Sequence, residues 1–218
     1  MEFIKEAFSQ NFAGFVMMLV IVFLGIMALA IFLERFVVLY FRANVDKDHF
    51  INHVQRAILS GDLNSAINYC NDRSAPLNNV VKAGLISVMN KGSEAEVQTA
   101  MDVSSLREVP AVERRTPFLA LFANVATLMG LLTTIWGLIG AFKAVKDVDP
   151  AQKAAVLAGE ISVAMNGTAL GLFVAIPTLL AYALLSAKTQ KILDDIHEVS
   201  VSTLNLILQN REKFPARN

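Results

Sequence analysis

The sequence contains a single cysteine, Cys70, which excludes an intramolecular disulfide framework and any metal or catalytic cluster built from cysteines. We expect Cys70 to be a small buried core residue. Basic and acidic residues balance, 19 against 19, so the charge gives no reason to expect nucleic acid as a partner. A Walker A sequence, a glycine-rich dinucleotide loop after a strand and a nucleophile elbow are all absent. His49 and His53 have the spacing of a metal pair, but two histidines without further ligands do not predict a site. These absences predict a protein that is not an enzyme and has no cofactor or metal.

Alternation of apolar and polar residues at period two is also missing over any useful length, so little or no β-sheet is expected. Hydrophobic residues make up 55% of the sequence and gather in three uncharged runs: 14–33, 116–142 and 161–187. A bilayer core about 30 Å thick is crossed by a helix of roughly 20 apolar residues. The sequence therefore predicts an all-α integral membrane protein with three transmembrane helices.

The three runs divide the chain into membrane and aqueous segments. In order, we expect an N-terminal outside segment with the first transmembrane helix (1–41), a cytoplasmic helical domain (42–115), the second transmembrane helix (116–142), a periplasmic loop (143–160), the third transmembrane helix (161–187) and a cytoplasmic C-terminal helix and tail (188–218).

The side of the membrane follows from the Lys and Arg residues near the ends of the runs, because these are richer on the cytoplasmic side. They divide six against four: Arg42, Lys47, Arg114, Arg115, Lys188 and Lys191 against Lys5, Lys143, Lys146 and Lys153. This bias predicts a periplasmic N-terminus and a cytoplasmic C-terminus in an inner membrane.

The aqueous segments have the pattern of amphipathic helices. Apolar residues recur at helical spacing through 50–70 and 77–89, and Ser93 with Glu96 fits a capping box. The C-terminal helix has one apolar side. That side needs a partner, either in the cytoplasmic domain or in a neighbouring subunit.

Polar residues interrupt the second span. Asn124, Thr127 and Thr134 fall within an arc of about 80° on a helical wheel, and Thr133 lies about 100° from Thr134. The arc indicates a polar stripe that faces a pore or a polar residue of a partner helix. The alternative for any single threonine is a hydrogen bond to a carbonyl of its own helix or to a neighbouring span.

Small residues indicate close packing of the two long spans. Gly167, Gly171 and Ala175 recur every fourth residue, a pattern that lets helix backbones approach each other in lipid. We assign the same packing role to Gly130 and Gly137 in the second span.

Other polar residues of the third span point in different directions. Thr168 lies beside the small-residue row, whereas Asn166 faces nearly the opposite way, so the two are expected to serve different interfaces. Pro177 should kink the helix or free a carbonyl. Glu160 is expected either to hold ions at the outer mouth or to be a solvated acid at the helix N-terminus.

Both spans resemble a known family, the MotA/TolQ/ExbB proton-channel family. The resemblance lies in residues 130–137 (GLLTTIWG) followed by Phe142, and in residues 167–177 (GTALGLFVAIP). Residues 61–63 and 83–85 fit the TolQ/ExbB branch. Three spans match that branch better than the four-span MotA.

The resemblance implies a ring subunit of an ion-driven motor. Members form a homopentamer around two copies of a single-span partner of the ExbD/TolR type, whose transmembrane aspartate takes up and releases the ion. Residue by residue, the ring threonines that face this aspartate correspond to Thr134 and Thr168. Flow of H⁺, or alternatively Na⁺, turns the ring relative to the partner and delivers work to the cell envelope.

Three positions depart from the family pattern. Thr127 stands where the family commonly has proline, Thr133 where it has glycine, and Val163 where many members have glutamate. Either that acid is dispensable, or Glu160 substitutes for it, or the ion is not handled as a proton. The additional hydroxyls suit Na⁺, which prefers oxygen ligands.

Neither long span contains a carboxylate, which favours a partner that supplies the acid. A non-conducting membrane scaffold and a self-sufficient channel remain the alternatives to the motor.

Overall fold

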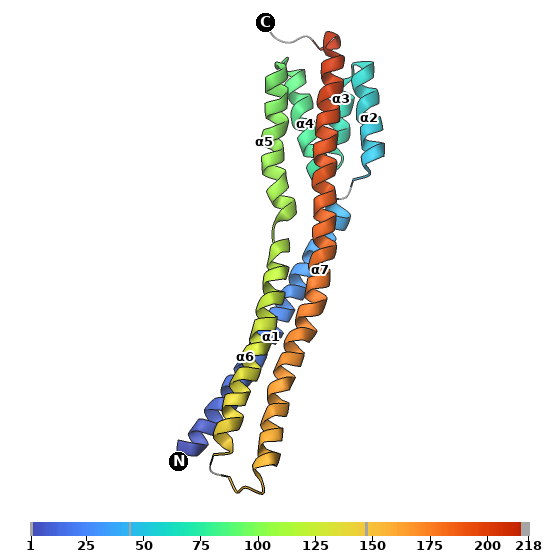
Figure 1. The fold of residues 1–218 in the computed structure, drawn as a ribbon. Coiled ribbons are helices and arrows are strands. Elements are labelled where there is room, and N and C mark those ends of the chain that lie inside the picture. The colour runs from blue at the N-terminus through green and yellow to red at the C-terminus, as the bar shows by residue number, and fades with distance from the viewer. Residues whose placement is uncertain (1, 44, 147, 215–218) are drawn as a thin grey trace. The chain divides into compact units, whose positions relative to one another are not determined.

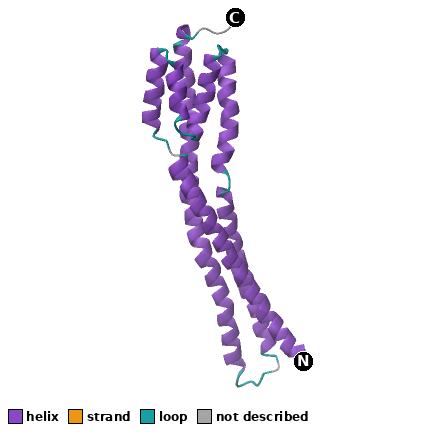
Figure 2. Cartoon of the chain, turned by 180° about the vertical axis from the view of Figure 1, so that it is seen from behind, coloured by secondary structure: helices purple, strands orange, loops and turns teal. Residues whose placement is uncertain are grey.

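A computed structural model describes residues 2–43, 45–146 and 148–214, with side chains from residue 14 onward. Figure 2 shows helices and connections, and no strand, in these residues, which confirms the all-α prediction for them. In chain order the elements are α1 (Glu2–Val37), a π-helical turn (Val38–Arg42), α2 (Lys47–Ser60), α3 (Leu63–Asn71), α4 (Pro76–Met89), α5 (Glu94–Glu113), α6 (Thr116–Ala144), α7 (Lys153–Gln209) and a 3-10 turn (Arg211–Lys213).

The chain forms two compact units. The first comprises Met1–Leu33 and Arg115–Leu184, and the second comprises Glu34–Arg114 and Leu185–Asn218. The helices α1 and α7 each contribute residues to both units.

The first unit holds the three predicted membrane spans. In Figure 1, α1, α6 and the first part of α7 lie side by side, and α1 starts at the end where α6 and α7 are connected. All three helices are long and apolar enough to cross a membrane. Their core consists of Ile21 with the small residues Ala123, Ala126 and Ala175, each at most 2% exposed. Bulky side chains such as Phe173 point outward, as expected for helices that face lipid.

The connection between α6 and α7 is shorter than the loop predicted at 143–160. Helix α6 continues to Ala144, and α7 already begins at Lys153. A turn at Asp149 precedes α7: the Asp149 side chain accepts from the Ala151 N–H, and the Asp149 carbonyl accepts from the N–H groups of Gln152 and Lys153. Glu160 therefore lies two turns inside α7, and the expectation of a solvated acid at the helix N-terminus is wrong.

Helix caps set the boundaries in the second unit. Asp62 follows Gly61, whose positive φ of 79° ends α2, and its side chain accepts from the Ser65 N–H at the start of α3. Ser93 and Glu96 form both bonds of the predicted capping box at the start of α5. The hydrogen bond from the backbone N–H of Ser93, and to a smaller extent its side chain, lowers the pKa of Glu96.

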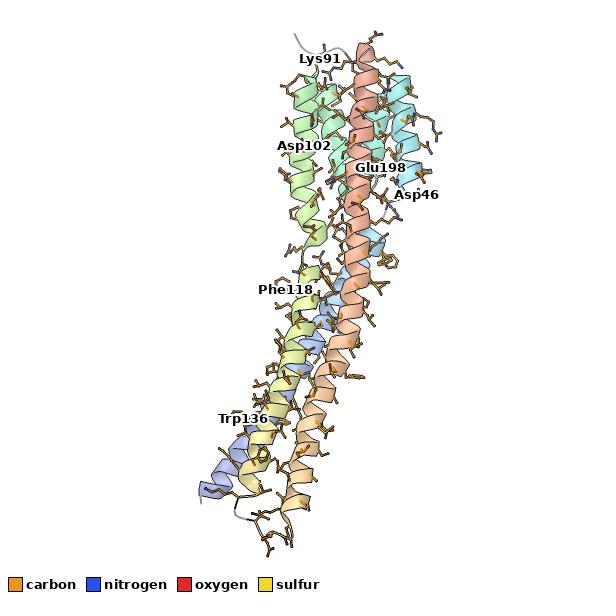
Figure 3. All side chains as sticks on the ribbon, viewed as in Figure 1. Asp46, Lys91, Asp102, Phe118, Trp136 and Glu198 are labelled. Atoms are coloured by element: carbon orange, nitrogen blue, oxygen red, sulfur yellow. The ribbon has the colours of Figure 1, made fainter. Side chains whose placement is uncertain are left out.

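The last part of α7 packs within the second unit, where its apolar side is covered. Ile196 and Val199 are at most 1% exposed. Lys47 of α2 binds Glu198 at 2.8 Å and Asp195 at 3.6 Å. In Figure 3, Glu198 and Asp46, the N-cap of α2, lie near each other. The partner of the C-terminal helix is therefore the preceding domain of the same chain.

Candidate functional site

Helices α6 and α7 meet along a seam of small residues that leaves no room for larger ones. A β-carbon placed on Gly130 would lie 3.2 Å from the Cα of Thr168, and one on Gly137 would lie 2.5 Å from the Cβ of Ala164. One placed on Gly171 would lie 2.7 Å from the carbonyl oxygen of Ala126. The two backbones thus touch at these positions.

Thr133 occupies the centre of the seam. Its side chain is 4% exposed, and a β-carbon on Gly167 would overlap with its methyl group. Thr133 therefore belongs to the packed seam, whereas Asn124 and Thr127 lie exposed on α6. The predicted stripe and Thr133 are thus on different faces, as the helical wheel requires.

Thr168 joins the two helices by a hydrogen bond. Its hydroxyl donates to the Gly130 carbonyl across the seam at 2.9 Å. The bond is possible because Gly130 has no side chain to hold the helices apart. This acceptor could not be predicted from the sequence. Which carbonyl faces Thr168 depends on the register between the two helices, and all contacts along the seam together determine that register.

Three threonines of α6 donate within their own helix. The hydroxyl of Thr127 donates to Ala123 at 3.1 Å, that of Thr133 to Met129 at 2.8 Å, and that of Thr134 to Leu131 at 2.7 Å. A hydroxyl has one proton and two lone pairs. In these bonds the proton is engaged, and the lone pairs stay available to accept a hydrogen bond or to coordinate a cation.

The polar residues divide among several surfaces. Thr134 and Thr168 are each half-buried, and Thr134 lies about 40° from Gly130 around α6, at the edge of the seam. Asn166 is exposed, on the opposite side of α7 from the row of small residues. A single chain therefore gathers Thr133 and Thr168 at the seam but leaves Asn124 and Asn166 on its outside.

Glu160 lies at a cavity of about 190 Å³ bounded by α1, α6 and α7. Thr133 and Trp136 line the same cavity, as does Val163. Figure 3 shows Trp136 on the part of α6 toward the α6–α7 connection. The sequence suggested that Glu160 could lie on the ion path. It did not predict the cavity, because one wall of the cavity is formed by α1, which is far from α6 and α7 in the sequence.

A larger apolar cavity of about 580 Å³ lies along α1 and α7 in the same unit, with Pro177 and Thr178 in its lining. Helix α7 continues through Pro177 without a break. The Thr178 hydroxyl donates to the Val174 carbonyl at 2.7 Å. The Thr178 hydroxyl therefore has a hydrogen-bond partner although the rest of the cavity lining is apolar.

The histidine pair of the second unit takes part in aromatic packing. The His49 ring nitrogen lies 3.0 Å from the Tyr69 hydroxyl, and the His53 ring stacks on Tyr69 with centroids 4.0 Å apart. Across the described residues, no three or more His, Cys, Asp or Glu side chains come together as metal ligands. The pair is explained by its contacts with Tyr69.

Known proteins resemble this chain over the region that holds the seam. The model of the MotA/TolQ/ExbB proton channel family matches residues 72–198. The Tol-Pal system protein TolQ of Haemophilus influenzae is 41% identical over 96 residues, which are 44% of this chain and only 42% of that protein. The biopolymer transport protein ExbB of Neisseria gonorrhoeae is 30% identical over 159 residues, which are 66% of this chain and 72% of that protein.

A solved structure has a similar fold. The structure of C. jejuni MotAB superposes with a TM-score of 0.56 and covers 94% of this chain and 84% of that chain. The two sequences are 17% identical, so this likeness concerns the fold alone.

Proposed function

Because the chain belongs to the MotA/TolQ/ExbB proton channel family, we propose that it is the ring subunit of an ion-driven motor in the bacterial inner membrane. In this proposal a homopentamer surrounds two copies of an ExbD/TolR-like single-span protein. Proton flow through the complex drives work on the cell envelope. The N-terminus lies in the periplasm and the C-terminus in the cytoplasm.

The observation that carries the proposal is the engagement of the threonine protons. The hydroxyls of Thr134 and Thr168 donate to carbonyls of the chain, so each presents acceptor lone pairs toward a partner. An accepting oxygen can bind a protonated carboxyl group. In this proposal the two threonines therefore bind the acid of the partner in its protonated form.

The acid itself has to come from the partner. Residues 116–142 and 161–187 contain no Asp or Glu, and a proton path through a membrane normally needs an ionisable group. Sodium is the alternative ion, because hydroxyl oxygens with free lone pairs are also ligands for Na⁺.

Replacement of both threonines tests the proposal. Thr134→Val with Thr168→Val removes two acceptor oxygens and keeps the size of the side chains. We expect loss of partner-dependent proton flux in liposomes and of envelope work in cells, with the complex still assembled. Thr178→Val is the matched control for the Thr134 change, since Thr178, like Thr134, donates to a carbonyl of its own helix but lies in the apolar cavity.

The alternatives predict different results. Normal flux and normal envelope work in an assembled double variant would contradict the motor. Flux through the chain alone, without its partner, would indicate a self-sufficient channel. A complex that conducts no ion before any substitution would indicate a scaffold.

A further inference from the structure

Helix α5 carries a strip of apolar side chains that the chain itself leaves uncovered. Val103 is 53% exposed and Leu106 is 76% exposed, the highest value among the bulky apolar side chains of α2 to α5. Pro110, one turn further along, is exposed as well. The exposed charged residues Asp102 and Arg107 flank this strip, so it faces water rather than lipid. An apolar patch with a polar rim indicates an interaction surface.

The same unit contains a groove of about 680 Å³ between α2 and the last part of α7. Val54 and Val201 give it apolar lining, and Val201 is 60% exposed. Glu198 adds a carboxylate to the lining. It binds Lys47 at 2.8 Å, but its side chain is 61% exposed and has lone pairs left for a second cation. The groove thus combines apolar surface with negative charge.

The strip and the groove belong to different edges of the second unit. Helices α2, α3, α4 and α5 pack in chain order, each against the next, and Figure 1 shows α5 and α2 on different sides of this unit. The two surfaces of one chain therefore do not cover each other. A contact between two different patches of identical copies is heterologous, and such contacts close into a ring when the rotation between copies fits.

Both surfaces lie at the same level along the helices. The Arg211 side chain donates to the Gly92 carbonyl, which brings the end of α7 to the beginning of α5. Val103 follows Gly92 by 11 residues and Val201 precedes Arg211 by 10, a distance of about 15 Å along each helix. Figure 3 likewise shows Asp102 of α5 and Glu198 of α7 at a similar level. A ring with its axis along these helices requires this match.

We propose that the α5 strip of one copy docks into the α2–α7 groove of the next copy. Leu106 then packs beside Val201, and the Arg107 guanidinium faces the Glu198 carboxylate. The charge of the strip and that of the groove are complementary, which favours a second copy of this chain as the occupant. The inference rests on the proposed homopentamer, for which it assigns the contact between the second units of neighbouring subunits.

Cysteine cross-linking between two differently tagged copies tests which faces meet. In a Cys70→Ala background, one full-length copy carries Leu106→Cys and the other carries Val201→Cys. A short bis-maleimide applied to native membranes should give a dimer with both tags. Asn68→Cys is the control for Leu106→Cys, because Asn68 is exposed on α3 and belongs to neither surface. This control should give no such dimer. Since Leu106 is largely exposed, its replacement should leave the fold of each copy intact.

The charge pair gives a second measurement. Arg107→Glu places a like charge against Glu198 and should slow the cross-linking of Leu106→Cys with Val201→Cys by about threefold, the size of an exposed ion pair. High salt should reduce this difference. Arg73→Glu makes the same charge change in the exposed turn between α3 and α4 and should leave the rate unchanged.

Three results would overturn the inference. One is the absence of the dimer with both tags. Another is a dimer formed by Leu106→Cys copies alone, which indicates a back-to-back contact. The third is an adduct of Val201→Cys with a different protein in place of the dimer, which gives the groove to another partner.

The proposed function is judged by separate measurements. A native mass of five copies, with flux that depends on Thr134 and Thr168, would leave the motor intact and place the subunit contact on other surfaces. A native mass of a single copy would contradict the ring as well as the docking.

Discussion

Three threonines in the middle of α6 donate to carbonyls of their own helix. The hydroxyls of Thr127, Thr133 and Thr134 each donate to a carbonyl three or four residues earlier in α6. In these bonds the hydroxyl oxygens keep lone pairs that can accept from a neutral acid or coordinate a cation. The helical wheel predicts on which side of α6 each threonine lies, but the acceptor of each hydroxyl depends on the side-chain rotamer, which no sequence pattern specifies.

Cys70 leads to a prediction that concerns the second unit alone. It is 1% exposed, and burial raises the pKa of its thiol from 9.0 to about 12, with a smaller opposing effect of the Lys82 charge. The thiolate is the reactive form. We expect Cys70 in the folded protein to resist Ellman's reagent at pH 8 and to react fully in denaturant. Ser74→Cys, an exposed position nearby, should react at once.

The same shift predicts the pH dependence of stability. Below pH 9 the thiol is neutral in both the folded and the unfolded chain, so stability does not depend on it. Between 9.0 and about 12 the unfolded chain loses the proton while the folded chain keeps it, and stability falls as the pH rises. Cys70→Ala should remove this part of the fall; an unchanged alkaline profile would contradict the assignment.

At the scale of elements, the seam between α6 and α7 depends on backbone contact. A β-carbon on Gly171 would lie 2.7 Å from the Ala126 carbonyl oxygen, a backbone atom that cannot turn away. We expect Gly171→Ala to separate the helices and lower the unfolding temperature of the purified protein in detergent.

Gly159→Ala is the matched control for this prediction. It lies on the same helix with nothing within 4 Å of the added β-carbon, so the change should be neutral or stabilising by about 1 kcal/mol through helix propensity. Equal unfolding temperatures for the two variants would show that the seam is not under steric constraint.

The elements themselves were largely readable from the sequence. Helical periodicity predicted α2 to α4, and the capping box of Ser93 and Glu96 predicted the start of α5 because capping is a local interaction. Residues 153–160 were assigned to the loop because the uncharged run begins only after Glu160, whereas the structure has them in α7. This segment is helical because residues such as Lys153, Ala154 and Leu157 favour a helix, and helix formation does not require an uncharged run.

The cavity at Glu160 could not be predicted for a different reason. It is formed by three helices from distant parts of the chain, with α1 about 120 residues before α6 in sequence. Sequence periodicity describes one helix at a time and carries no information on the register between helices. Candidate site residues on a single helix could therefore be proposed from the sequence. Which of these residues lie together in one cavity could not be predicted.

For the whole molecule, the proposed orientation gives a prediction from labelling in intact cells. Residue 149 lies in the α6–α7 connection, and residue 212 follows α7; both are exposed. In a Cys70→Ala background, Asp149→Cys should react with a membrane-impermeant maleimide from outside the inner membrane, once the outer membrane is permeable. Glu212→Cys should react only after the inner membrane is broken. The reverse labelling pattern would contradict the proposed orientation and place the C-terminus in the periplasm.

The Thr168–Gly130 bond has a consequence for biogenesis. The hydroxyls of Thr127, Thr133 and Thr134 are satisfied inside α6, so this helix can leave the translocon and enter lipid alone. The Thr168 hydroxyl finds its acceptor only on α6. Helix α7 is thus best inserted when α6 is already beside it, which favours release of the two as a hairpin. Assembly of the subunit would then be ordered by the same bond that positions Thr168.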